Sequence, residues 1–393
     1  MLSLETVFWL IGQAVAVLLL SDSLLRAALL CLRAIGRARG ETTEAGASNG
    51  CVVLVAAHDE AGTIGPTVTA LKNHLREWPG SVLWVVADRC ADKTAIEAAV
   101  AGARVAERGD GRLGKGAVIA WWLRNHEAEW RAREAIVILD ADSRLAEGSL
   151  GSLRMAVGSA AGDSAAFQAF VAPDAETGSG RLAGWSEVLM QRIDDEARSR
   201  RGWSVPLRGT GMVFRGDILS DLAPRLHTLA EDLELDVLLA ARRKRVVFVP
   251  EAVVFDPKPQ LPAGASRQRA RWLRGQLQVL RDYWREIIVA LIKGGSGAWL
   301  LLAPLFLRPK ILFLGLRVLM LMASVLFPAW FWYAVVGLAM DLAYYLAGAA
   351  MVDNPRRYLL DLFAAPRYAA IWSYSFGIAM IRRGQRDWLR VGR

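Results

Sequence analysis

Four groups of residues in this chain have the types and spacing needed for chemistry on a diphosphate. In chain order they are Asp88, Asp140-Ala141-Asp142, Glu231-Asp232 and Gln268-Arg269-Ala270-Arg271-Trp272. The Asp-x-Asp pair offers the hard oxygen ligands that a divalent cation prefers. The Glu-Asp pair offers a carboxylate that can take a proton from an attacking hydroxyl group. A departing diphosphate needs cations, and an arginine guanidinium matches phosphate geometry. Together the four groups predict an enzyme.

The elements that must position these groups appear as alternating apolar segments. Strands are expected at Cys51–Ala57, Ser81–Ala87, Ala135–Leu139 and Arg245–Val249, and helices at Ile64–Leu75, Thr94–Ala101, Gly116–His126 and Glu231–Arg242. This alternation predicts an α/β domain with a parallel sheet and helices on both faces. Asp88 and Asp140 each follow a strand, and open α/β sheets bind ligands at the carboxyl ends of their strands. We therefore expect a nucleotide at that edge.

Each acidic motif also has a purely structural explanation. On an extended chain, Asp140 and Asp142 point to the same side and can face one ion, although a solvated loop is the alternative. Asp88 can accept hydrogen bonds from a base or ribose. Its alternative role is an N-cap, for which Asp92 is better placed before the helix from Thr94. Glu231-Asp232 opens a helix, where acidic residues also suit the helix dipole.

Two glycine-rich stretches remain open between ligand binding and ordinary turns. Gly114-Lys115-Gly116 precedes a helix, so a phosphate could bind at the helix N-terminus beside Lys115. The spacing is not that of a Walker A motif. Arg208-Gly209-Thr210-Gly211-Met212 either lets the backbone approach a ligand closely or forms a plain hairpin turn.

Composition predicts one soluble domain joined to membrane segments. The chain has 393 residues and a formal charge of +9, with a mean hydropathy of +0.26. Much of the basic excess flanks apolar stretches, as at Arg33, Arg37 and Arg39, which is typical of the cytoplasmic side of membrane spans. We therefore expect no nucleic-acid partner. The three cysteines are odd in number and form no Cys-x-x-Cys pair, so we expect free thiols.

The first apolar stretch, Thr6 to Leu32, is long enough to span a bilayer. Asp22 and Arg26 lie one helical turn apart and can neutralise each other. A cleavable signal peptide is the alternative, but a membrane span is favoured, because no positive charge precedes the apolar run and the basic cluster follows it. The basic flank that follows places the C-terminal end of this helix in the cytosol.

The C-terminal part is again apolar. Ile311–Phe327 and Ala329–Met351 are predicted as two spans, and Ala298–Leu307 as an interfacial segment. Leu359–Ile381 is open between a further span and a surface helix, and Pro366 and Arg367 favour the surface. The Arg- and Trp-rich stretch Ala265–Trp284 predicts an amphipathic helix at the membrane interface.

These segments define the expected domain organisation. It consists of a membrane helix with its basic flank (1–39), a linker (40–50), a cytoplasmic catalytic domain (51–264), a Gln-x-x-Arg-Trp region with interfacial helices (265–310), two transmembrane helices (311–352) and a C-terminal amphipathic or membrane segment with a basic tail (353–393). Arg317 and Asp341 lie at similar distances from Pro328, so antiparallel spans would bring them to the same depth as an ion pair.

The order of the four motifs resembles that of the family 2 glycosyltransferases with a GT-A fold, and most closely the membrane-bound bacterial branch. Supporting stretches are Val55–Glu60, Ala87–Thr94, Gly114–Gly116, Gly209–Met212 and Pro250–Val254. The resemblance covers roughly Cys51 to Arg281 and the tail from Trp388 to Arg393. It implies a Rossmann-like GT-A domain with transmembrane helices on both sides. Two positions depart from the family pattern: Ala230 replaces the usual Thr, and Asp59 replaces the usual Asn.

The resemblance also implies roles for individual residues. Asp232 would be the catalytic base, and Mg²⁺ or Mn²⁺ would be held by Asp140 and Asp142. The nucleotide-sugar would be bound by Glu60, Asp88, Lys115, Asp140, Gln268 and Arg271, and the acceptor by Glu231, Trp272 and Gly211.

The expected function is transfer of a sugar from a UDP-sugar, with inversion, to a lipid-linked acceptor in exopolysaccharide or glycolipid synthesis. The expected location is the bacterial inner membrane, with several spans and a cytoplasmic catalytic domain. Two alternatives stay open. The enzyme could glycosylate a membrane lipid directly, such as a ceramide, hopanoid or polyprenyl phosphate, or the chain could be a non-catalytic nucleotide sensor.

Overall fold

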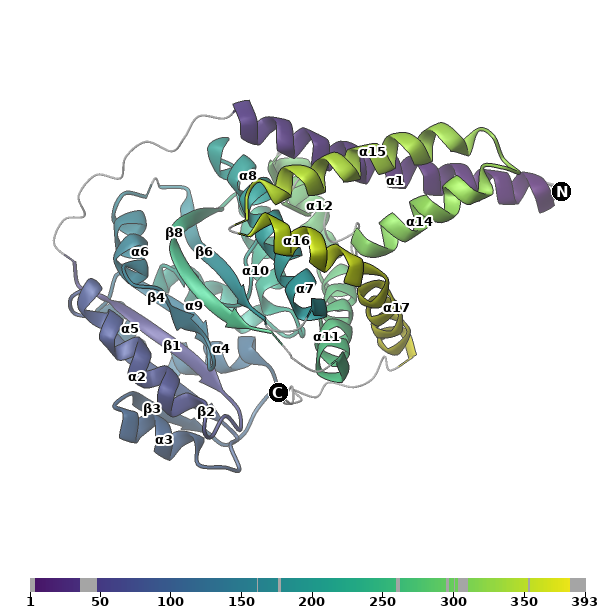
Figure 1. Cartoon of the computed structure of the whole chain (residues 1–393). Coiled ribbons are helices and arrows are strands. Elements are labelled where there is room, and N and C mark those ends of the chain that lie inside the picture. The colour runs from purple at the N-terminus through teal and green to yellow at the C-terminus, as the bar shows by residue number, and fades with distance from the viewer. Residues whose placement is uncertain are drawn as a thin grey trace.

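The structure is a computed structural model, shown in Figure 1. It describes residues 4–35, 48–160, 162–175, 178–258, 262–294, 297–299, 301–302, 310–352 and 354–381. Four expected features therefore lie wholly or partly outside the described residues: the basic flank at Arg37 and Arg39, the linker up to residue 47, residues 300 and 303–307 of the interfacial segment, and the tail Trp388–Arg393.

The first half of the central sheet is parallel, as the sequence predicted. Its strands are β1 (Cys51–Ala57), β2 (Val82–Asp88), β3 (Arg104–Arg108) and β4 (Ala135–Asp140), in the spatial order β3-β2-β1-β4. All three neighbouring pairs run in the same direction. The expected strands are confirmed, with Asp88 and Asp140 as the last residues of β2 and β4, and the carboxyl ends of both strands reach the same edge of the sheet.

The second half of the sheet is mixed, so the parallel arrangement indicated by the strand–helix alternation is limited to the first half. The remaining strands are β5 (Arg144–Leu145), β6 (Ser164–Asp174), β7 (Met212–Phe214) and β8 (Arg245–Pro257). β7 is antiparallel to both β4 and β6, and β5 is antiparallel to β8. A short buried run such as β7 fits either direction, because apolar periodicity carries no information about strand polarity.

Helices cover both faces of the sheet, as expected. Val52 and Leu54 of β1 belong to one apolar core and Val53 and Val55 to the other, because successive side chains alternate between faces. The first core contains residues of α4 (Lys115–Asn125), α9 (Gly216–Leu222), α10 (Glu231–Ala241) and α12 (Trp284–Lys293). The second contains residues of α2 (Ile64–His74), α3 (Thr94–Ala101) and α6 (Ser149–Gly158). The short helix α5 (Glu127–Arg131) adds Trp130 to the first core.

Three apolar helices extend from the α/β domain: α1 (Leu4–Ile35), α14 (Lys310–Ala323) and α15 (Trp330–Ala349) (Figure 1). Among the described residues, α1 and α15 contain segments long and apolar enough to cross a membrane, whereas α14 is shorter. The predicted span Ile311–Phe327 thus ends early, at Ala323, where a turn leads into α15. α1 and α15 run in the same direction, since Gly12 lies against Trp330 and Arg26 against Asp341.

The stretch predicted as one amphipathic helix, Ala265–Trp284, is the end of one helix and the start of another. α11 (Pro262–Asp282) stops before Tyr283, and α12 begins at Trp284. The two helices that follow α15 are α16 (Pro355–Asp361) and α17 (Ala365–Ile381). α17 packs on α11, with the Arg269 guanidinium over the ring of Tyr368. This contact fits the surface alternative for Leu359–Ile381.

On the other side of α16 lie α7 (Gly178–Leu189), a π-helical turn (Met190–Asp195) and α8 (Glu196–Arg200). Arg181 of α7 forms an ion pair with Asp361 of α16 at 2.6 Å. Tyr344 of α15 donates a hydrogen bond to Asp194 of the π-helical turn at 3.3 Å. These contacts attach the apolar helices to the α/β domain. Cys31, Cys51 and Cys90 are free thiols, as expected.

Candidate active site

Lys115 connects three of the predicted motifs. It is the first residue of α4, and its ammonium donates hydrogen bonds to Asp140 Oδ1 at 2.5 Å and to the carbonyl oxygen of Gly209 at 2.7 Å. The same ammonium lies 4.0 Å from Glu231 Oε1. The Lys115 side chain is buried, whereas that of Asp140 is 41% exposed. One lysine therefore holds the end of β4 next to the start of α10.

The glycines beside Lys115 permit this close approach. Gly114 precedes α4 with φ of +109°, a conformation that L side chains rarely adopt. A Cβ atom at Gly116 would lie 2.7 Å from Leu226 Cβ, so the helix could not pack here with a larger residue. The glycine-rich turn is thus required by the fold, and it brings a cation to the sheet edge. Phosphate binding at this turn stays a prediction.

Asp140 is held in its ionised form by nearby cations. Burial would raise the pKa of its carboxyl, but the Lys115 ammonium outweighs this effect and lowers the pKa, with smaller contributions from Arg271 and Lys258. The backbone N–H of Asp140 donates to Thr210 Oγ1 at 3.2 Å. Asp142 is partly buried in the loop that follows β4. Both predicted metal ligands are therefore found at the carboxyl end of β4.

The Glu-Asp motif opens α10 inside the protein. Burial raises the pKa of Glu231 to about 7, even though Lys115 opposes this shift, and the adjacent Asp232 raises it further. Gly209 lies between the two halves of the site. Its carbonyl oxygen accepts from Lys115, and a Cβ atom at this glycine would lie 3.8 Å from Asp232 Oδ2. The predicted base, Asp232, is therefore adjacent to Gly209, whose carbonyl oxygen accepts from the same Lys115 ammonium that pairs with Asp140.

α11 brings the last motif against the segment that precedes Glu231. A Cβ atom at Gly275 would lie 2.7 Å from Ala230 Cβ and 3.0 Å from the Ala230 nitrogen. The Leu229 N–H donates to Gln278 Oε1 at 3.0 Å. The small side chains at positions 230 and 275 allow this contact, which gives the Ala230 departure from the family pattern a packing reason. Gln268 and Arg271 lie on the same helix.

Asp88 is placed differently from the expectation of an open nucleotide ligand. Its carboxylate is fully buried and forms ion pairs with Arg108, at 2.6 Å, and with Arg89. Arg89 adopts a positive φ of 49°. Direct contact with a base or ribose requires one guanidinium to move aside, so that role stays a prediction. Asp92 was the better N-cap candidate, but the N-cap of α3 is Lys93. Asp92 lies one residue earlier, and its Oδ1 accepts from the Thr94 N–H at 2.9 Å.

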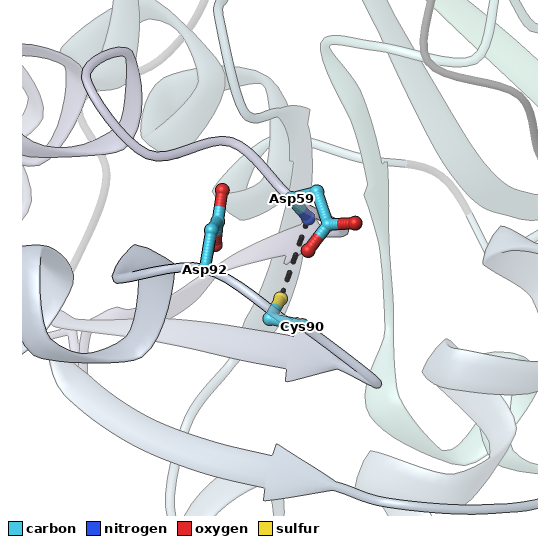
Figure 2. A group of neighbouring side chains, drawn as sticks. All are labelled: Asp59, Cys90 and Asp92. Carbon is cyan, nitrogen blue, oxygen red and sulfur yellow. Dashed lines mark hydrogen bonds between the residues drawn. The ribbon is translucent and has the colours of Figure 1, made fainter.

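Figure 2 shows a second acidic group, Asp59, Cys90 and Asp92, between the loops after β1 and β2. Asp59 Oδ1 accepts from the Ala91 N–H at 2.7 Å, and the Asp59 N–H points to Cys90 Sγ at 3.4 Å. Asp92 Oδ2 accepts from the backbone of the first loop. These bonds account for the group as a clasp between two loops. The clasp holds Glu60, whose N–H donates to a side chain of α3 at 2.7 Å.

Gly211 is required by the backbone. Its φ is +65°, and a Cβ atom there would lie 2.9 Å from Val254 Cγ2 and 3.1 Å from Ala169 Cβ. The residue is buried between β6 and β8. The backbone conformation and the close packing explain this glycine, although no hairpin forms here, because Gly211 ends the loop between α8 and β7. Contact with an acceptor stays a prediction.

A cavity of about 620 Å³ begins at the predicted catalytic residues. Asp232, Gln268 and Trp272 line it on the side of the α/β domain. The opposite wall comes from the apolar helices and includes Leu314 of α14 and Leu338 of α15. Residues of α16 and α17 also contribute. The cavity therefore joins the predicted base to the helices that were expected in the membrane.

Four charged residues that line this cavity were not found by sequence reasoning: Glu187, Asp236, Asp256 and Lys258. Arg208, from the glycine-rich stretch, lines it too. For Asp256 and Lys258 the signal was available, because they follow an apolar strand just as Asp140 does. Glu187 carries no local pattern that marks it.

The comparisons with known proteins support the fold and family. The model of "Glycosyl transferase family group 2" matches residues 135–348. No curated protein matches the chain. The solved mannosyltransferase PcManGT from Pyrobaculum calidifontis, in complex with GDP-Man and Mn²⁺, has 16% sequence identity and a TM-score of 0.56, over 95% of this chain and 98% of that one.

Two other solved structures share less of the chain. Glucosyl-3-phosphoglycerate synthase from Mycobacterium tuberculosis, in complex with Mn²⁺, UDP and phosphoglyceric acid, is 17% identical with a TM-score of 0.40, over 63% of this chain and 80% of that one. Mannosyl-3-phosphoglycerate synthase from Rubrobacter xylanophilus is 18% identical with a TM-score of 0.38, over 60% and 75%. The family match covers more than half of the chain, and the motifs within it meet at one site. The chain belongs to glycosyl transferase family group 2 and has the GT-A fold.

Proposed function

We propose that this protein is an inverting, metal-dependent glycosyltransferase that moves a sugar from a UDP-sugar to a lipid or lipid-linked acceptor at a membrane. The observation that carries the proposal is the cavity between Asp232 and the apolar helices α14 and α15. A water-soluble acceptor needs no such connection. An acceptor with an apolar tail does, because its tail is stable among apolar side chains while its head reaches the base.

Asp232 is the proposed general base. It lines the cavity together with Gln268 and Trp272, and an acceptor hydroxyl bound in this cavity can reach it. In the proposed reaction the carboxylate takes the hydroxyl proton while the oxygen attacks the anomeric carbon. The bond from that carbon to the diphosphate breaks on the opposite side, which inverts the anomeric configuration. UDP leaves with the electron pair.

The donor is proposed to bind at the ends of β2 and β4. The residues present fit a divalent cation, since Asp140 and Asp142 offer carboxylate oxygens at one strand end and the Asp140 side chain is partly exposed. One Asp140 oxygen pairs with Lys115, and a carboxylate has a second oxygen that can ligate. Mg²⁺ or Mn²⁺ bound here would neutralise negative charge on the diphosphate. Arg271 would add a second cation on the leaving side.

The acceptor is proposed to enter from the bilayer with its head at Asp232 and Trp272. Two acceptors remain: a lipid-linked glycan in exopolysaccharide synthesis, and a membrane lipid itself, such as a ceramide, hopanoid or polyprenyl phosphate. The proposed location is the bacterial inner membrane, with α1 and α15 as spans. The basic flank after α1 favours the cytosol for the catalytic domain.

The test is sugar transfer by purified protein in nanodiscs, with Mn²⁺ and a panel of UDP-sugars and GDP-sugars. Each donor is supplied with lipid extract, and both UDP or GDP release and glycolipid formation are followed. Asp232→Asn keeps the shape of the side chain but cannot take the proton, so transfer should fall about a hundredfold or more while nucleotide binding stays normal. Near-normal turnover of this variant would remove Asp232 as the base. A protein that binds UDP but makes no product with any acceptor would instead support a nucleotide sensor.

A further inference from the structure

A buried lysine with two carboxylate partners lies in the cavity wall, outside the four motifs. The Lys258 ammonium lies 2.6 Å from Asp256 Oδ2 and 2.7 Å from Glu187 Oε2. Asp256 lies near the end of β8, Lys258 directly follows the strand, and Glu187 comes from α7. The side chain of Lys258 is 6% exposed, and those of Glu187 and Asp256 about one fifth. All three line the cavity that contains Asp232.

This cluster also lies within electrostatic reach of the donor site. The positive charge of Lys258 contributes to the lowered pKa of Asp140. Burial raises the pKa of Asp256, Lys258 opposes that shift, and the negative charges of Glu187 and Asp140 increase it. The cluster therefore interacts with the predicted metal ligand and shares a cavity with the predicted base. The sugar must occupy this region, because it is transferred from the diphosphate to an acceptor beside Asp232.

A purely structural role for the cluster is the alternative, since it joins α7 to β8. The segment that follows α7 is attached to the sheet without charges. The Gln191 amide accepts from the Val171 N–H at 2.7 Å and donates to the Val171 carbonyl at 2.8 Å, which fixes the π-helical turn after α7 to β6. Burying three charged side chains is costly, and a buried ion pair adds little stability compared with apolar packing. Charges that face a cavity are better explained by a polar ligand.

We propose that Glu187, Lys258 and Asp256 bind hydroxyl groups of the donor sugar and thereby select which sugar is transferred. The proposal rests on the glycosyltransferase function proposed above. Sugar hydroxyls both donate and accept hydrogen bonds, and this cluster offers an ammonium donor between two carboxylate acceptors. An ammonium can donate three hydrogen bonds. Within the described part of the chain, the Lys258 ammonium pairs with two carboxylates, those of Glu187 and Asp256. A hydroxyl placed between these groups is recognised by its position on the ring, because a misplaced hydroxyl leaves buried polar groups unpaired.

Binding measurements can separate the sugar from the nucleotide. Affinities for UDP and for UDP-glucose, UDP-galactose, UDP-N-acetylglucosamine and UDP-glucuronic acid are determined by calorimetry in the presence of Mn²⁺. Wild-type protein is compared with Lys258→Met, Glu187→Gln and Asp256→Asn. We expect UDP affinity to change by less than about twofold and the affinity for the preferred UDP-sugar to fall by about tenfold or more. Lys258→Arg, which keeps the charge, should restore part of the loss.

A matched control removes a different ion pair. Arg104→Met breaks the exposed Arg104–Glu129 pair on β3, and it should leave the affinities for UDP and UDP-sugars unchanged. Glu187→Gln and Asp256→Asn keep the size of the original side chains. These two variants can therefore test the proposal even if Lys258→Met does not fold.

Three results would overturn the proposal. In the first, the variants bind the preferred UDP-sugar as tightly as the wild type does. In the second, UDP and UDP-sugar weaken equally, which indicates a structural role. In the third, donor binding is unchanged and only the KM for the lipid acceptor rises, which assigns the cluster to the acceptor head. Failure of the wild-type protein to bind any nucleotide would refute the proposed function and is distinguishable from all three.

Discussion

Arg317 of α14 donates to Asp341 of α15 at 2.9 Å across the apolar hairpin, and both side chains are almost completely buried. The sequence predicted this pair. The structure extends it, because Asp22 and Arg26 of α1 close a ring with the same two residues. Arg26 contacts Asp22 at 2.5 Å and Asp341 at 3.1 Å, and Arg317 contacts Asp22 at 2.9 Å. Two negative and two positive charges cancel within one network that ties three helices together.

Removing one member of this ring should leave a charge without its partner in an apolar region. Asp341→Ala should destabilise the protein by about 3–5 kcal/mol, the usual cost of breaking a buried ion pair. Arg317→Leu combined with Asp341→Leu should recover part of this loss, because Asp22 and Arg26 remain as a neutral pair. Folded yield and Tm in detergent are the measurements, since Asp341 also lines the cavity and activity would not separate the two effects. Purely additive losses in the double-mutant cycle would contradict the coupling.

Chelation should abolish sugar transfer if a divalent ion is bound by Asp140 and Asp142. Treatment with excess EDTA is expected to stop UDP release, and Mg²⁺ or Mn²⁺ added afterwards should restore it, because hard cations exchange readily at carboxylate sites. Asp142→Asn should raise the metal concentration needed for half-maximal activity. Full activity after exhaustive chelation would rule out a metal-dependent mechanism.

Gly275→Ala should impair the enzyme although alanine is the better helix former. A Cβ atom at this position meets Ala230 at 2.7 Å, so α11 must move away from the segment that precedes Glu231. The matched control is Gly65→Ala in α2, where the nearest atom is 4.0 Å away. That change should stabilise the protein by up to about 1 kcal/mol through helix propensity alone. Equal effects of the two substitutions on Tm and on kcat would argue against the close contact.

The buried carboxyl of Glu231 predicts a specific dependence of stability on pH. Its pKa in the folded protein is about 7, above the ordinary value, because burial disfavours the charged form. Between these two values the folded state binds more protons than the unfolded state, so the contribution of Glu231 is most favourable at low pH and is lost as pH rises through about 7. Glu231→Gln removes this titration. Its Tm should therefore fall less than that of the wild type between about pH 5 and pH 8. Parallel Tm curves would refute the shift.

The enzyme is expected to add one sugar per encounter and not to extrude a polymer. A polymer channel needs a bundle of helices around a wet lumen to shield the polar chain from lipid. In the described part of the chain, α1, α14 and α15 pack around an ion-pair ring, and α17 packs on α11. Mass spectrometry of the product, with excess UDP-sugar and limiting acceptor, should find a single added sugar. Long chains beside unused acceptor would contradict single-sugar transfer. They would indicate that an oligomer of this protein assembles the pore.

Short-range patterns in the sequence determined the elements and the types of chemistry. Periodicity placed β1, β2 and β4, because a buried strand needs a continuous apolar run whatever its neighbours are. The strand ends then marked Asp88 and Asp140. Arg317 and Asp341 were predicted as partners because a charge in an apolar helix requires one.

Only the tertiary structure decided how distant segments meet. The reversed direction of β7, the contact of Lys115 with both Asp140 and Glu231, and the arginines that enclose Asp88 all depend on the path of the chain. The same is true of the Glu187–Lys258 pair in the cavity wall. The sequence shows the chemical type of each of these residues but not which residue it contacts. Ion pairs and close backbone contacts act over only a few ångströms, so the packing of segments far apart in the chain decides the partner.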